Sequence, residues 1–222
     1  MKTLNHAAAF FDVDETLLNL KSMFSFLRYA YAHQYPQTGA QDYHMALIAL
    51  QNEARTTTRA QVNHQYYALY QGWQRADVAA LAAEWFKGIN QPQNYLAPAL
   101  MRLHWHQAQG HQVVLVSGAC QEILAPLAAF LGVNATLGVC LESDEQGVLS
   151  GLIEGVQTIG VGKAQVVIDY MRRHRLCAST CYAYGDHITD VPMLEAVGHP
   201  YVVNAQEVML AWASQHGVEV LT

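Results

Sequence analysis

The sequence lacks the features that mark a membrane-spanning, secreted or nucleic-acid-binding protein. None of its apolar runs reaches the roughly 18 residues that a membrane-spanning helix requires. The first run, residues 7–11, is too short for the core of a signal peptide, and no basic flank or cleavage site accompanies it. The chain has no Lys/Arg-rich run and carries a formal net charge of −6. We therefore expect a cytoplasmic protein that binds neither membrane nor nucleic acid.

Cysteine is scarce as well, and its spacing excludes two further classes. The chain has four cysteines, none of them in a CxxC pair, which argues against a disulfide framework and against a zinc knuckle. We expect buried, free thiols in a reducing compartment. The cysteines are Cys120, Cys140, Cys177 and Cys181.

Short apolar runs alternate with segments of helical periodicity along most of the chain, which is typical of βαβ units. The expected strands are residues 7–13, 112–117, 136–141, 180–185, 200–203 and 218–221. The expected helices between or after them are Gln121–Leu131, Lys163–His174, Asp190–Val197 and Ala205–Gln215. A polar turn within residues 140–151 predicts a hairpin. The pattern predicts an α/β fold, a Rossmann-like three-layer core with a parallel sheet.

The stretch from about residue 20 to 110 contains no convincing strand. Its candidate helices are Met23–Gln34, Gln41–Glu53, Arg59–Tyr70, Asp77–Gly88 and Tyr95–Gln109. A crossover needs only a dozen or so residues, so this block is too long to be one. We expect an all-helical cap over residues 20–110, inserted into a core made of residues 1–19 and 111–222. The alternative is that these helices merely cover one face of the sheet.

Two pairs of carboxylates follow apolar runs at opposite ends of the chain. Asp12 and Asp14 end the first run, and Asp186 and Asp190 follow residues 181–185. The carboxyl ends of parallel strands are where open α/β folds bind ligands, so we expect the pairs to meet. Clustered carboxylates repel one another, and a Mg²⁺ ion, which prefers oxygen ligands, relieves that repulsion. Taken alone, Asp12 and Asp14 would more often form a strand-end turn that caps a helix.

Other residues in the sequence suit the binding and transfer of a phosphoryl group. Ser117 and Gly118 end a strand before a helix, where a hydroxyl and free amides can hold phosphate oxygens. Lys163 opens a helix after a glycine-containing loop and could neutralise developing charge. A carboxylate such as Asp12 can attack phosphorus, and a second one two residues on can serve as acid and then base. Taken alone, Ser117-Gly118 is more often an ordinary turn, and Lys163 could be a solvated helix lysine.

The order DxDxT, Ser-Gly, Lys and GDxxxD resembles the four motifs of the haloacid dehalogenase (HAD) superfamily of phosphohydrolases. The helical insertion resembles the C1-capped branch that includes phosphoserine phosphatase. The resemblance spans residues 12 to 190 and implies a Mg²⁺-dependent hydrolase of small phosphate monoesters that works through an aspartyl phosphate. It implies Asp12 as nucleophile, Asp14 as general acid and base, and Lys163 as a bridge between nucleophile and phosphate. Ser117 and the Gly118 amide would hold the phosphate.

The same resemblance implies a metal site. The Asp12 side chain, the Asp14 main-chain carbonyl and Asp186 would bind Mg²⁺, with Asp190 in support. The partner implied is a small-molecule phosphate ester, and the sequence does not define the oligomeric state.

Two positions depart from the pattern of phosphoserine phosphatases. Such enzymes typically carry a glutamate nine residues after the nucleophile to hold the substrate ammonium, whereas this chain has Lys21, which would attract an anion. His187 stands where a small residue commonly follows the first aspartate of the last motif. Arg55 and Arg59 could hold a substrate anion or remain solvated. The aromatic run Tyr66, Tyr67, Tyr70 and Trp73 could line a substrate pocket, although helix packing is its commoner role.

Three rival functions remain open at this point. The first is a phosphotransferase that passes the phosphoryl group from the aspartyl phosphate to a small alcohol, because the same residues serve both reactions. The second is a haloacid dehalogenase proper, against which Asp14 speaks. The third is a non-catalytic binding protein with this fold, which we would expect to have lost a motif residue. Because the motif set is complete, it favours an enzyme.

Overall fold

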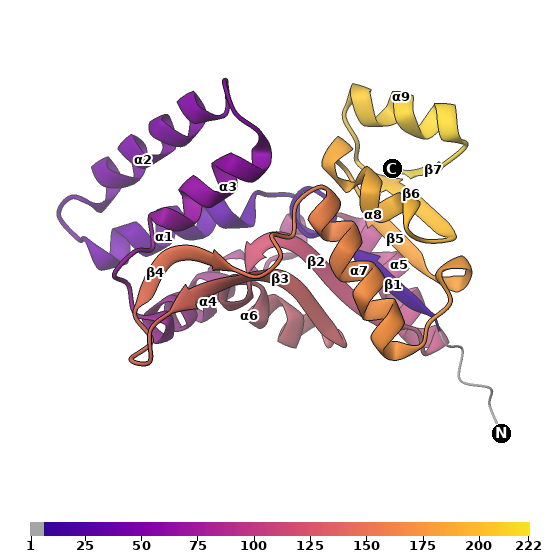
Figure 1. The fold of residues 1–222 in the computed structure, drawn as a ribbon, viewed down its shortest axis with the longest axis horizontal. Helices are drawn as coiled ribbons and strands as arrows, with labels where there is room; N and C mark the ends of the chain where they lie inside the picture. The colour runs from indigo at the N-terminus through magenta and orange to yellow at the C-terminus, as the bar shows by residue number, and fades with distance from the viewer. Residues whose placement is uncertain (1–6) are drawn as a thin grey trace.

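The computed structural model describes residues 7–222, whose strands form one sheet in the order β4-β3-β2-β1-β5-β6-β7. Neighbouring strands run parallel except in the β3–β4 hairpin, so the predicted parallel sheet and hairpin are confirmed. The central strand β1 lies between β2 and β5, and its carboxyl end therefore lies beside theirs (Figure 1). The strands are β1 (Ala8–Phe11), β2 (Gln112–Cys120), β3 (Ala135–Ser143), β4 (Leu149–Glu154), β5 (Tyr182–Gly185), β6 (His199–Val203) and β7 (Glu219–Leu221).

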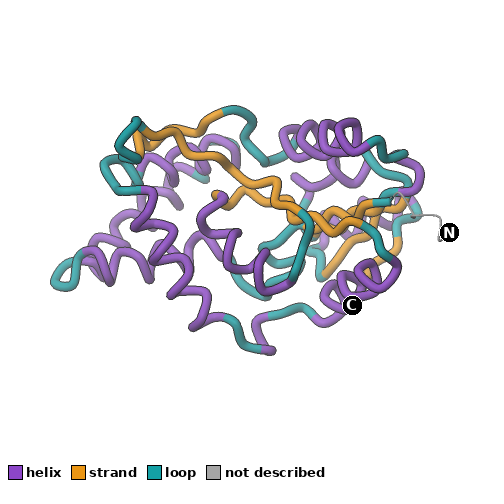
Figure 2. Tube along the Cα trace, turned by 90° about the horizontal axis from the view of Figure 1, so that it is seen from below, coloured by secondary structure: helices purple, strands orange, loops and turns teal. Residues whose placement is uncertain are grey.

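Both faces of the sheet are covered by helices, and the alternation of side chains along β1 shows why. Ala8 and Phe10 pack on one side with residues of α7 (Val161–His174), α8 (Val191–Glu195) and α9 (Glu207–His216). Ala9 and Phe11 pack on the other side with residues of α5 (Ala97–Gln109) and α6 (Gln121–Leu131). Figure 2 shows the strands as a layer between helices. The three-layer, Rossmann-like class is confirmed.

The segment between β1 and β2 is helical, as predicted. It contains α1 (Ser22–Gln34), α2 (Gly39–Glu53), α3 (Arg59–Ala68) and α4 (Arg75–Ile89) before α5. Helices α1, α2 and α3 extend beyond the sheet in Figure 1, whereas α4 packs on α6 and α5 packs on β2. A capping box of Thr58 and Gln61 begins α3, which holds that helix at a defined start. The cap boundaries at residues 20 and 110 remain a prediction.

Most predicted elements begin or end within two residues of the observed ones, and the largest difference is at the end of β2. The strand expected over residues 112–117 continues to Cys120, while α6 begins at Gln121 as expected. Pairing with β3 shifts register between Val116 and Cys120, so Ser117 and Gly118 lie in an irregular part of β2. Ser117 and Gly118 are therefore separated from the start of α6 by an irregular stretch of strand, and their role in holding phosphate remains a prediction.

The cysteines are free, as expected, although only two of them are buried. Cys120 and Cys181 lie in the interior, whereas Cys140 and Cys177 are exposed. Cys140 is exposed because it faces outward from the hairpin strand β3. Within residues 7–222, no helix has both the length and the apolar character required to cross a membrane.

Candidate active site

The first carboxylate pair stands where β1 ends. The Asp12 N–H donates to the Tyr184 carbonyl of β5 at 2.9 Å, which extends the strand pairing by one residue. The chain then turns sharply, with Glu15 at φ 62° in the left-handed region. Thr16 follows, and its hydroxyl donates to Asp186 Oδ1 at 3.0 Å. The DxDxT segment is thus hydrogen-bonded both to β5 and to the loop that follows β5.

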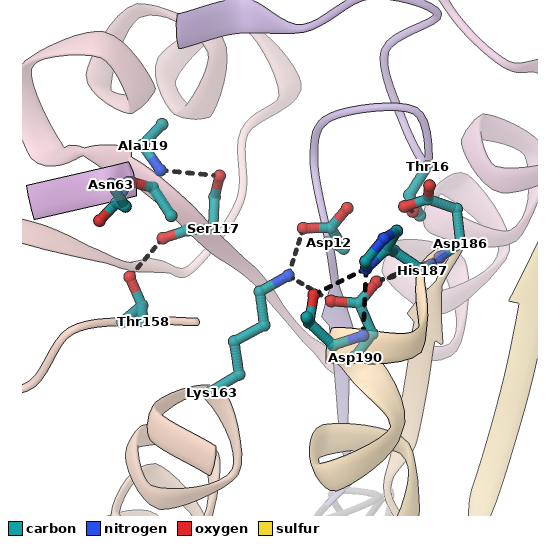
Figure 3. A network of polar contacts seen from close by, with 12 residues as sticks. Asp12, Thr16, Asn63, Ser117, Ala119, Thr158, Lys163, Asp186, His187 and Asp190 are labelled. Atoms are coloured by element: carbon teal, nitrogen blue, oxygen red, sulfur yellow. Dashed lines mark hydrogen bonds and ion pairs between the residues drawn. The ribbon is translucent and has the colours of Figure 1, made fainter. Parts of the chain in front are cut away.

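Lys163 occupies the centre of the site. Its ammonium lies 2.5 Å from Asp12 Oδ1 and 2.6 Å from Asp190 Oδ1, as Figure 3 shows. Gly162 lets the start of α7 come this close, because a Cβ there would lie 1.8 Å from the Gln157 carbonyl oxygen. Burial alone would lower the pKa of Lys163, but the charges of Asp12 and Asp190 outweigh it and hold the pKa above its ordinary value. The lysine is therefore a fixed cation between two carboxylates.

Asp190 shapes the loop after β5. Its Oδ2 accepts the N–H groups of Asp186 at 3.2 Å and His187 at 3.1 Å, while Oδ1 faces Lys163. A Cβ on Gly185 would lie 2.7 Å from the Asp190 Cβ, so this position needs glycine for close approach. His187 Nδ1 accepts the Thr189 N–H at 3.1 Å and caps the short turn that follows. His187 therefore holds the loop that carries Asp186 and Asp190.

Burial sets the protonation of the aspartates. Burial raises the pKa of Asp12, although Lys163 opposes the shift. The pKa of Asp186 rises to about 8, first because of burial and then because of the charges on Asp12 and Asp190. Burial also raises the pKa of Asp14 to about 6, although the nearby Ser22 hydroxyl acts in the other direction. Among the described residues, Asp14 Oδ1 is one of the few buried side-chain atoms without a hydrogen bond of ordinary geometry.

The donor set fits a hard divalent cation. Asp12, Asp186 and Asp190 each bring a carboxylate oxygen within 4.8 Å of the others. All the donors are oxygen atoms, and three carboxylates stand against the single ammonium of Lys163, which pairs with two of them. Oxygen ligands of this kind suit Mg²⁺.

The Ser-Gly pair lies across from the carboxylates. Ser117 is 3 % exposed, and its Oγ accepts the Ala119 N–H at 3.1 Å. The hydroxyl hydrogen of Ser117 is therefore free to be donated to a ligand. A Cβ on Gly118 would lie 3.1 Å from the Ile159 side chain, so glycine leaves the room that this face of the site needs.

One cavity of about 140 Å³ joins these groups. Every residue that the sequence singled out for catalysis, phosphate or metal lines it, together with Lys21 and Arg59. Arg55 is exposed and is not among the lining residues. The complete lining is Asp12, Asp14, Lys21, Met23, Phe24, Arg59, Val62, Asn63, Tyr66, Ser117, Gly118, Ile159, Lys163, Asp186, Thr189 and Asp190.

Some contributors have no signal in the sequence. Asn63 and Tyr67 of α3 contact the Gly118 carbonyl, and Thr158 contacts the Ser117 carbonyl. These contacts join positions more than 40 residues apart, so no local spacing could have revealed them. Tyr70 and Trp73 of the aromatic run are buried in the core, which matches the packing role.

Fold and site together define an α/β enzyme with an acidic, lysine-bridged cavity at the carboxyl ends of β1, β2 and β5. The family model of haloacid dehalogenase-like hydrolases matches residues 9–195. The chain belongs to this family.

Relatives and solved structures agree with that assignment. A probable phosphatase of Mycobacterium tuberculosis is 31% identical over 217 residues, which cover 97% of this chain and 75% of the relative. A phosphoserine phosphatase of the same organism is 30% identical, and the match covers 96% of this chain and 70% of the relative. A Bordetella pertussis protein of unknown function superimposes with a TM-score of 0.86 at 24% identity, covering 97% of this chain and 98% of that one. The last similarity concerns the fold.

Proposed function

We propose that this protein is a Mg²⁺-dependent phosphatase that hydrolyses small phosphate monoesters through a phosphorylated Asp12. The observation that carries the proposal is the cavity in which Lys163 bridges Asp12 and Asp190 while Ser117 and Gly118 line the same space. Relatives named as phosphatases support the same reaction class.

The residues suit a two-step displacement. In the first step, an Asp12 carboxylate oxygen forms a bond to phosphorus as the ester P–O bond breaks, and the Asp14 carboxyl gives its proton to the leaving oxygen. In the second step, the Asp14 carboxylate takes a proton from water, whose oxygen attacks phosphorus and releases phosphate and the Asp12 carboxylate. A pKa of about 6 allows Asp14 to act as an acid in the first step and as a base in the second near neutral pH.

The other groups bind and orient. The Ser117 hydroxyl and the Gly118 amide would hold phosphate oxygens, and Lys163 would stabilise charge that develops on them. Asp12, Asp186 and Asp190 would hold Mg²⁺ together with the Asp14 main-chain carbonyl. When bound, the ion would polarise a phosphoryl oxygen and offset the negative charge of the site.

Cations at the cavity rim favour a substrate whose leaving group carries an anion. Lys21 and Arg59 line the cavity, and both side chains are exposed. Lys21 lies 3.5 Å from Glu15, a loose and solvated contact that leaves its charge available. A positive rim repels a substrate ammonium and attracts a carboxylate. We therefore propose a phosphorylated hydroxy acid or sugar acid in preference to phosphoserine.

The first experiment measures phosphate release from p-nitrophenyl phosphate in Mg²⁺ and in chelator, with wild type and with Asp12→Asn. We expect metal-dependent turnover that falls by at least about 1,000-fold in Asp12→Asn, because the nucleophile is lost. The matched control is Asp169→Asn, which removes an outer carboxylate of α7 that pairs with Arg172. Turnover that persists in Asp12→Asn would refute the nucleophile, and turnover unaffected by chelator would refute the metal requirement.

The substrate class is tested by comparing kcat/KM for phosphoserine and for a phosphorylated hydroxy acid without an amino group. Reversing the charge in Lys21→Glu should shift the ratio toward phosphoserine by about tenfold. Lys87→Glu, which changes an exposed lysine of α4 that pairs with Glu84, is the control and should leave the ratio unchanged. An equal ratio in Lys21→Glu and wild type would remove Lys21 from the specificity argument.

A further inference from the structure

Three distant segments meet around Ser117 and Gly118. They are helix α3 of the insertion, the irregular end of β2, and the loop that precedes α7. Their contacts all fall on two successive peptide groups, those between Ser117 and Gly118 and between Gly118 and Ala119. The first peptide carries the Gly118 N–H, and the N–H of the second donates to the Ser117 hydroxyl. The proposed function assigns this hydroxyl and the Gly118 N–H to phosphate.

The Gly118–Ala119 peptide is held from α3. The Gly118 carbonyl accepts a hydrogen bond from Asn63 Nδ2 at 3.1 Å and another from the Tyr67 hydroxyl at 2.8 Å. A peptide group is planar, so holding its oxygen also fixes the direction of the N–H on its other side. That N–H belongs to Ala119 and donates to Ser117 Oγ, as Figure 3 shows. Helix α3 thus fixes the Ser117 hydroxyl through one peptide plane.

The Ser117–Gly118 peptide is held from the opposite side. The Thr158 hydroxyl donates to the Ser117 carbonyl at 2.5 Å, and Thr158 is 1 % exposed. By the same planarity, this bond sets the direction of the Gly118 N–H.

The contacts from α3 and the contact from Thr158 are connected through Gln157. Gln157 Nε2 donates to the Ala60 carbonyl of α3 at 2.8 Å and to Asn63 Oδ1 at 2.9 Å. Gln157 directly precedes Thr158, so the loop before α7 and helix α3 hold one another as well as β2. Helix α3 also carries Arg59, which lines the cavity.

We propose that Asn63, Tyr67 and Thr158 are positioning residues that orient the phosphate-holding groups of Ser117 and Gly118 through these two peptide planes. In this role α3 is part of the phosphate site, because two of its side chains hold the Gly118 carbonyl. Helix α3 then acts on both parts of the substrate: Arg59 faces the leaving group, and Asn63 and Tyr67 orient the groups that hold phosphate. The inference rests on the proposed function, because it assumes that Ser117 and Gly118 bind phosphate.

The experiment measures the binding of inorganic phosphate, in Mg²⁺, by titration calorimetry and as competitive inhibition of ester hydrolysis. Tyr67→Phe removes one of two donors to the Gly118 carbonyl, and we expect about fivefold weaker binding. Thr158→Val removes the hydroxyl that holds the Ser117 carbonyl, and we expect about tenfold weaker binding. Thr158→Ser keeps a hydroxyl and should restore binding to within about threefold of wild type.

Tyr70→Phe is the matched structural control. Tyr70 is as fully buried as Tyr67, and its hydroxyl bonds to the Tyr66 hydroxyl at 2.6 Å instead of to β2. Urea unfolding should show similar losses of stability in Tyr67→Phe and Tyr70→Phe, while phosphate binding weakens only in Tyr67→Phe.

The outcomes separate the inference from the proposed function. If wild type binds phosphate and Tyr67→Phe and Thr158→Val bind it equally well, the inference is overturned and the proposed function stands. If Tyr70→Phe weakens binding as much as Tyr67→Phe, the effect is general packing and the inference is overturned. If wild type neither binds phosphate nor hydrolyses the ester, the proposed function and the inference fall together.

Discussion

Two groups of buried polar side chains contact strands β1 and β5, and they differ in how their polar atoms are compensated. The active-site cluster, defined as Asp12, Asp14, Lys163, Asp186 and Asp190, lies at the carboxyl ends of the strands. The histidine pair consists of His106, which packs against Tyr184 of β5, and His111, which packs against Tyr182 of the same strand. His106 bonds to His111 between the Nδ1 atoms at 2.8 Å and to the Tyr184 hydroxyl through Nε2 at 2.8 Å.

The two groups differ in charge and in how completely they are hydrogen-bonded. The histidine pair is neutral, because burial lowers the pKa of His106 to about 3 and also lowers that of His111. Both ring nitrogens of His106 have partners. The active-site cluster instead places carboxylates of raised pKa around one ammonium and leaves Asp14 Oδ1 without a hydrogen bond of ordinary geometry. The histidine pair is thus uncharged and hydrogen-bonded, whereas the active-site cluster places several buried carboxylates around a single ammonium.

The largest effect is expected when the single cation of the active-site cluster is removed. Lys163→Met leaves Asp12 and Asp190 buried without their counter-charge. We expect turnover to fall by about 1,000-fold and the free energy of unfolding of the metal-free protein to drop by about 3 kcal/mol at neutral pH. Phosphate release and urea unfolding measure the two effects.

The matched control is Lys87→Met on the surface of α4, which should change stability by less than about 0.5 kcal/mol. The loss in Lys163→Met should also shrink in mild acid, because the stranded carboxylates then take up protons. A full loss of stability in Lys87→Met, or none in Lys163→Met, would contradict this view of the cluster.

The sequence predicts much of this site because its chemistry sits at strand ends. Asp12 and Asp186 follow apolar runs, and parallel pairing alone brings such positions together. Their ordered spacing also resembles known motifs, and the chain's place in the family confirms that resemblance.

What the sequence does not predict depends on contacts through space. Tyr67 reads as a packing residue of an amphipathic helix, and only the fold brings its hydroxyl to Gly118. The need for glycine at position 185 arises from the nearness of the Asp190 side chain and not from a turn angle. The extension of β2 to Cys120 follows from an irregular pairing with β3, which no local preference encodes.

A smaller effect is expected when unmet charge is removed from the active-site cluster. The folded pKa of Asp186 is raised from 3.8 to about 8, so its ionisation destabilises the metal-free protein increasingly as the pH rises above 3.8. Asp186→Asn removes that charge and keeps an oxygen to accept the Thr16 hydroxyl. We expect the melting temperature in chelator to rise by about 2–4 °C while turnover is lost. Thermal unfolding beside Asp169→Asn measures the gain, and a lower melting temperature in Asp186→Asn would show that its charge is already compensated.

The smallest effect concerns acid, to which the two groups should respond with opposite signs. The folded pKa of His106 lies below the ordinary 6.5, so its contribution to stability is complete above pH 6.5 and is lost as the pH falls toward 3. The raised pKa values of Asp12 and Asp186 act the other way, since protonation removes buried negative charge as the pH falls.

In chelator, the wild-type protein should therefore show a shallow dependence of unfolding free energy on pH, as the two contributions partly cancel. His106→Asn removes the main histidine contribution and leaves that of the carboxylates uncancelled, so we expect lower stability at pH 7.5 and a stability that rises as the pH falls from 6.5 to 4.5. Urea unfolding across this range measures the slope, and His44→Asn, at an exposed position of α2, should leave it unchanged. An identical slope in His106→Asn and wild type would mean that the histidine pair takes up protons without unfolding, and the contrast between the two groups would then rest on charge in the active-site cluster alone.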